Sequence, residues 1–94
     1  MPEGIFVQQI EFHRERADHF LKAARQRHRR AAALAQQALA AQRQGRPIQA
    51  ERLMESALRV KAAAGRASLR SRNHRARIAE IRRAQRTLRR PPVC

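Results

Sequence analysis

The sequence is poor in the side chains on which most enzyme sites depend. It has no tryptophan or tyrosine, a single cysteine at its last position, Cys94, and four histidines that no common motif connects. One cysteine excludes an internal disulfide and a multi-cysteine zinc site, and neither a catalytic triad nor a phosphate-binding loop can be read. We therefore expect a protein that is not an enzyme, with no catalytic residue, no cofactor and no metal ion.

One short segment gathers acidic residues and histidines. Glu11, Glu15 and Asp18 follow one another at the spacing of a single helix face. His13 and His19 are six residues apart, on different faces, whereas paired metal ligands on a helix are typically about four apart. The segment therefore predicts a solvated acidic stripe whose charge is balanced by nearby arginines.

Long apolar runs are absent as well. No stretch approaches the roughly eighteen apolar residues that a membrane-spanning helix needs. The first residues have neither the basic nor the apolar region of a signal peptide. These absences predict an intracellular protein, cytoplasmic or nuclear, that is neither secreted nor transmembrane.

Acidic side chains are far outnumbered by basic ones. Seven acidic residues stand against 22 lysines and arginines, for a formal net charge of +15, and twenty of the basic residues are arginine. The segment 59–94 alone holds twelve basic residues and one acidic residue, Glu80. Arginine presents a planar, permanently charged fork that suits phosphate and carboxylate, so the excess predicts an anionic partner. A genome biased toward arginine and alanine would give the same excess, and the sequence leaves that alternative open.

The helical elements are marked by spacing and by helix breakers. Neither proline nor glycine occurs from Phe6 to Gln44, and small or apolar residues recur there every three or four positions. Gly45 and Pro47 then suit the end of one helix and the first turn of the next. Gly65 weakens the following stretch, so the second helix either ends there or continues. The predicted helices cover about 6–44, 47–64 and 67–90.

From these elements we predict an all-α fold. The short connection at Gly45 predicts an antiparallel helical hairpin, and the segment after Gly65 predicts a basic third helix, together a small three-helix bundle. A single domain would cover residues 1–90, followed by a tail at 91–94. Within the first helix, the arginine-rich run 25–30 is the point at which we expect the helix to bend or to leave the core.

The candidate partner-binding residues are the arginines of the last helix and two apolar residues of the second. Arg75, Arg82, Arg86 and Arg89 would form a continuous ridge on a helix. The complete predicted set comprises Arg70, Arg72, Arg75, Arg77, Arg82, Arg83, Arg86 and Arg89 together with Met54 and Leu58.

Two functions fit this surface. The leading one is a non-enzymatic interaction module, or adapter, that binds an acidic protein or peptide through the hairpin and the arginine-rich helix. The alternative is an RNA- or DNA-binding protein that contacts mainly the phosphate backbone, because the phenylalanines at 6, 12 and 20 lie near the other end of the sequence. An acidic membrane surface would suit the same arginines, and residues 6–41 could form a homodimer seam.

The segment 34–58 resembles the first helical hairpin of MIT domains, the microtubule interacting and trafficking modules. It has Leu34-Ala35 with Ala38, then Gly45 at the turn, then Ala50, Leu53 and Ala57 at matching offsets. The resemblance implies a three-helix module whose groove receives short, often acidic peptides. It also implies that Leu69, Ile78 and Ile81 face inward from the third helix.

Overall fold

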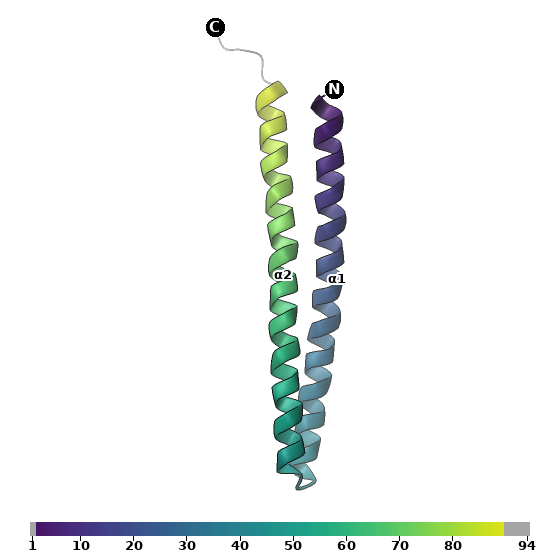
Figure 1. Ribbon diagram of the computed structural model, residues 1–94, viewed down its shortest axis with the longest axis vertical. Helices are drawn as coiled ribbons and strands as arrows, with labels where there is room; N and C mark the ends of the chain where they lie inside the picture. The colour runs from purple at the N-terminus through teal and green to yellow at the C-terminus, as the bar shows by residue number, and fades with distance from the viewer. Residues whose placement is uncertain (1, 90–94) are drawn as a thin grey trace.

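The chain forms one long antiparallel hairpin. In the computed structural model, which describes residues 2–89, helix α1 covers Pro2–Arg43 and helix α2 covers Pro47–Arg89. The two helices lie side by side, with the free ends at one end of the molecule and the turn at the other (Figure 1). The molecule extends 77 × 22 × 12 Å. The all-α prediction and the antiparallel hairpin are thus confirmed.

The turn forms as its residues predict. Gly45 adopts a left-handed φ of 72°, a conformation that glycine tolerates better than any other residue. The amide of Arg46 donates to the carbonyl of Ala41 at 2.9 Å, and the amide of Gly45 donates to the carbonyl of Gln42 at 3.1 Å. This hydrogen-bond pair closes the last turn of α1 as a Schellman motif, and Pro47 begins α2.

The prediction of a separate third helix is wrong, because α2 runs without interruption through Gly65. A glycine in a helix costs about 1 kcal/mol relative to alanine. Its neighbours Ala64 and Ala67 are buried against α1, and their packing keeps the helix continuous. A three-helix bundle therefore does not form, and the arginine-rich segment is the second half of α2. Helix α1 is unbroken through the arginine-rich run 25–30, and all six residues of that run are exposed.

A seam of small residues holds the helices together. Most of the buried residues recur at intervals of seven, and Ala41, Ala67 and Ile81 each lie three positions after one of them. This spacing keeps them on one face of each helix, as in a coiled coil. The Ser71 hydroxyl donates to the carbonyl of Ala17 at 2.8 Å across this seam. The seam consists of Ala17, Ala24, Ala31 and Ala38 from α1 and of Ala57, Ala64, Ser71 and Ile78 from α2.

The same seam accounts for the apolar stripe of residues 6–41. Its buried members lie against α2 of the same chain, so a dimer through this stripe would have to displace α2. Of the residues that the MIT resemblance places inward, Ile78 and Ile81 are buried, whereas Leu69 is exposed. Within residues 2–89, neither helix has a stretch long and apolar enough to cross a membrane.

Candidate interaction surfaces

Most of the predicted site residues lie on one stripe of α2. Met54, Leu58 and the later arginines are separated by three, four, seven or fourteen residues, which places them along a single side of the helix. This stripe comprises Met54, Leu58, Arg72, Arg75, Arg82, Arg86 and Arg89. Of the remaining predicted residues, Arg70 lies on the other side of the seam beside Phe20, and Arg77 pairs with Glu80 at 2.8 Å. Arg83 lines none of the hollows described below.

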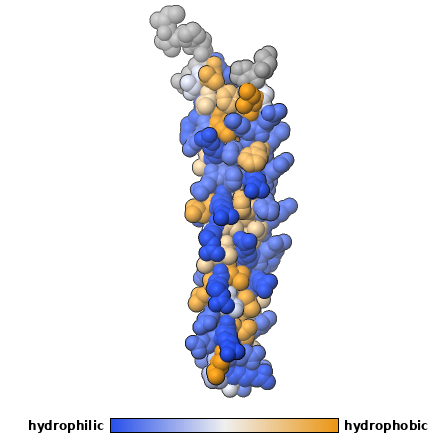
Figure 2. Space-filling view, in the orientation of Figure 1, coloured by the Kyte–Doolittle hydropathy of each residue, from blue (hydrophilic) through white to orange (hydrophobic). Residues whose placement is uncertain are grey.

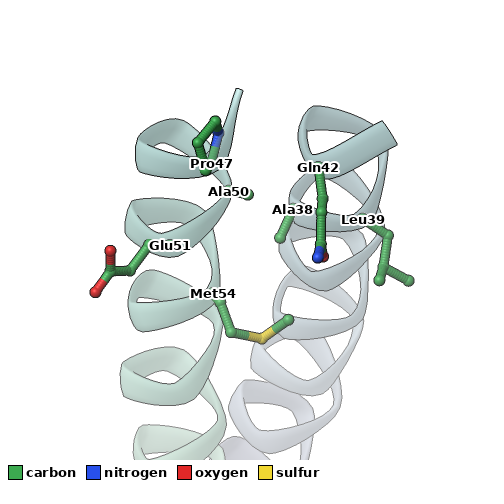
Figure 3. Close-up of a pocket in the computed structure, with 7 residues that line it drawn as sticks. All are labelled: Ala38, Leu39, Gln42, Pro47, Ala50, Glu51 and Met54. Carbon is green, nitrogen blue, oxygen red and sulfur yellow. The ribbon is translucent and has the colours of Figure 1, made fainter. Parts of the chain in front are cut away.

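The stripe borders a groove between the two helices, which we call the open groove. Near the turn it contains two adjoining hollows that share Met54. Figure 3 shows the Met54 side chain extending from α2 toward α1, below Ala38 and Ala50. Met54 is 37% exposed and Leu58 59% exposed. The apolar residues that line this half are Ala31, Ala32, Ala35, Ala38, Leu39, Pro47, Ala50, Met54, Ala57 and Leu58.

Toward the free ends the same groove becomes basic. A third hollow has Ala17 and Ile78 beside the arginines Arg14, Arg75 and Arg82. On α2, Arg75 lies three positions before the buried Ile78, and Arg82 lies four positions after it. Near the turn, Met54 and Lys61 are placed in the same way around the buried Ala57. The third hollow is therefore on the same side of the seam as the first two. Asp18 is the one carboxylate that lines it.

The arginines in this half are not neutralised within the hairpin. Among the described residues, no carboxylate pairs with Arg14, Arg75 or Arg82, and the ion pair that does form, Arg77 with Glu80, is exposed. Exposed pairs of this kind stabilise a fold by at most about 1 kcal/mol. The acidic stripe predicted to answer the nearby arginines, Glu11, Glu15 and Asp18, makes no ion pair with them inside residues 2–89. The groove therefore presents unneutralised positive charge.

The opposite side of the seam carries an aromatic cluster, formed by Phe12, His13, Phe20 and His74. The ring of Phe20 lies nearly parallel to that of His74, with a centroid distance of 5.8 Å and an angle of 9°. Phe12 meets His13 and His74 edge to face. The antiparallel pairing thus brings N-terminal aromatic rings beside the arginine-rich half of α2, which sequence distance alone did not predict.

Two arginines flank this cluster. The guanidinium carbon of Arg16 lies 5.4 Å from the centroid of Phe20, and that of Arg70 lies 5.5 Å from the same centroid. Both distances are within the range of cation–π attraction. Together with Asn73, Phe12 and His74 these residues line a hollow of about 410 Å³.

The two histidines of the cluster form a contact across the seam. Their Nδ1 atoms lie 2.8 Å apart, so the N–H of one ring donates a hydrogen bond to the ring nitrogen of the other. Burial lowers the pKa of His13, and the neighbouring His74 and Arg77 lower that pKa further. Among the described residues, no three metal-ligating side chains gather as a metal site requires. The pair is therefore a hydrogen-bonded polar layer in an otherwise small-residue seam.

Both surfaces lie on a strongly hydrophilic molecule. Figure 2 shows one face of the hairpin, on which hydrophilic residues dominate and small apolar patches recur along its length. Comparison with protein-family models, with curated proteins and with solved structures found no match. The MIT resemblance therefore rests on the residues at 34–58 alone.

Proposed function

We propose that the hairpin is a non-enzymatic interaction module whose open groove binds an amphipathic, acidic helix of a partner protein. The observation that carries this proposal is the change of character along one groove. Its turn half is lined by exposed apolar side chains such as Leu39, Met54 and Leu58. Its other half is lined by Arg14, Arg75 and Arg82.

A helix suits the groove because two packed helices leave a furrow that a third helix can fill. Helices pack with their axes about 8–10 Å apart, side chains of one entering the grooves of the other. Helix-in-groove recognition uses apolar anchors at three-four spacing. Leu58 and Arg75 are seventeen residues apart on α2, which is about 26 Å along a helix. A partner helix of some twenty residues would therefore contact both halves.

An acidic partner suits the groove because Arg14, Arg75 and Arg82 form no ion pair with a carboxylate among the residues that the structure describes. Each can form charge-assisted, bidentate hydrogen bonds with a glutamate or aspartate. A second copy of the chain has the opposite property, since it would bring another net charge of +15 against the same arginines. The charge complementarity therefore favours a different, acidic protein over self-association.

The proposal is tested with a labelled synthetic helix that carries leucines at one end and glutamates at the other, titrated by fluorescence anisotropy. Replacing both apolar anchors, Met54→Ala with Leu58→Ala, should weaken binding roughly ten-fold or more. Replacing Arg75→Gln with Arg82→Gln should also weaken it. The matched control is Arg66→Gln with Arg83→Gln, which removes the same charge from exposed positions that do not line the groove.

The outcomes separate three accounts. Loss in both groove variants but not in the control supports the open groove. Equal loss in the control and in the arginine variant means that attraction is diffuse and the groove plays no part. If sedimentation shows that the chain dimerises without peptide and that the groove variants are monomeric, a second copy is the occupant and the proposal fails.

A further inference from the structure

We propose that the hollow around the aromatic cluster binds single-stranded nucleic acid, with a base on Phe12 and the adjoining phosphates on Arg16 and Arg70. This site lies across the seam from the open groove and goes beyond the function proposed above. It joins two features that single-strand binding requires, a ring face for stacking and a positive surface that follows the backbone.

The stacking surface is Phe12. Its side chain is 55% exposed although it belongs to a cluster of rings. An exposed phenylalanine is not required by the fold, because the neighbouring seam positions are filled by His13, Phe20 and His74. The rings of His13 and His74 meet Phe12 edge to face, and Phe12 lines the hollow beside Phe20. A base stacked there would cover apolar surface that is otherwise in water.

The positive surface is formed by Arg16 and Arg70. Both guanidinium groups converge on the ring of Phe20, one from each helix. Neither forms an ion pair with a carboxylate among the described residues, and no acidic residue lines the hollow. Phosphate oxygens accept bidentate hydrogen bonds from such groups. Asn73, also in the lining, offers an amide that can donate to and accept from a base edge.

The chemistry favours a single strand over a duplex. In a duplex the faces of the bases are stacked on one another, so they are not free to lie on Phe12. Phosphate attraction alone would favour the duplex instead, since its charge density is higher. The preference between the two forms therefore separates a stacking site from general attraction to a basic protein.

The test compares the affinities of a labelled single strand of about twelve nucleotides and of a duplex of the same sequence, measured by anisotropy near physiological salt. The single strand should bind more tightly. Phe12→Leu, which keeps an apolar side chain but removes the ring, should weaken single-strand binding roughly ten-fold. Arg16→Gln with Arg70→Gln should weaken it by at least as much.

The matched control is Arg75→Gln with Arg82→Gln, which removes the same charge from the open groove. It should change single-strand binding less than three-fold or so, and Phe12→Leu should leave binding of the acidic helix unchanged. Circular dichroism verifies that each variant remains helical. Tighter duplex binding, an unchanged Phe12→Leu variant, or equal losses in the two arginine pairs would each overturn the site.

Discussion

The hydroxyl of Ser71 donates a 2.8 Å hydrogen bond to the backbone carbonyl of Ala17, from the centre of one helix face to the centre of the other. Ser71 is buried, and its bond satisfies a polar group that would otherwise destabilise the seam. Moving from this pair by seven residues in opposite directions along the two helices places Ala24 beside Ala64. The bond thus defines the register that aligns both sides of the open groove.

The close seam predicts that a larger side chain at its centre is not tolerated. Ala64 is fully buried, so Ala64→Leu should push the helices apart and lower the free energy of unfolding by about 1–3 kcal/mol. Ala62→Leu, at an exposed position two residues away, should change it by no more than about 0.5 kcal/mol. Urea unfolding followed by circular dichroism measures both. Equal effects of the two leucines would show that the helices do not pack through Ala64.

The continuity of α2 predicts that its glycine is dispensable. A Cβ added at Gly65 meets no atom within 4 Å, and its φ is not in the left-handed region. Gly65→Ala should therefore raise the free energy of unfolding by about 0.5–1 kcal/mol. Thermal unfolding of the two proteins gives the difference. A destabilised variant would indicate a turn at this position, as in the three-helix arrangement.

The histidine contact predicts a stability that depends on pH. The pKa of His13 is lowered in the folded protein, chiefly by burial and then by His74 and Arg77. The unfolded chain, with a histidine pKa of about 6.5, therefore binds more protons as the pH falls. The stabilisation is complete above about pH 6.5 and is lost as the pH decreases from there toward the folded pKa.

This dependence is measured as melting temperature between about pH 7.5 and pH 5.5. His13→Leu with His74→Leu should flatten the profile over that interval. His28→Gln, at an exposed position outside the histidine contact, serves as the control and should retain the slope of the parent. A parent that melts at the same temperature throughout the interval would contradict the contact.

The fold was predictable where local chemistry decides it. Gly45 and Pro47 mark the turn because a left-handed residue and a residue with a fixed φ are needed there. The predicted break at Gly65 was wrong because the cost of a glycine in a helix, about 1 kcal/mol relative to alanine, is small. The burial of Ala64 and Ala67 against α1 overrides it. Such packing depends on the partner helix and is not visible in a short window of sequence.

The interaction surfaces were likewise predictable where the spacing along one helix decides them, and not where the pairing of the two helices does. Helical spacing alone placed Met54, Leu58 and most of the arginines on one stripe of α2. The aromatic cluster was missed, because Phe12 and Phe20 are some fifty residues from Arg70 in the sequence. The seven-residue spacing of small residues, at 17, 24, 31 and 38 in α1 and at 57, 64 and 71 in α2, could have predicted that the phenylalanines lie near Arg70.

The most direct test of the open groove maps amide and methyl chemical-shift changes in the isotope-labelled hairpin as the acidic amphipathic helix is added. We predict that the changes concentrate on the groove, at Leu39, Met54 and Leu58 in its apolar half and at Arg75 and Arg82 in its basic half. The signals of Phe12 and Asn73, across the seam, should remain in place. Changes spread over arginines on all sides, or centred on the aromatic cluster, would contradict a helix bound in the open groove.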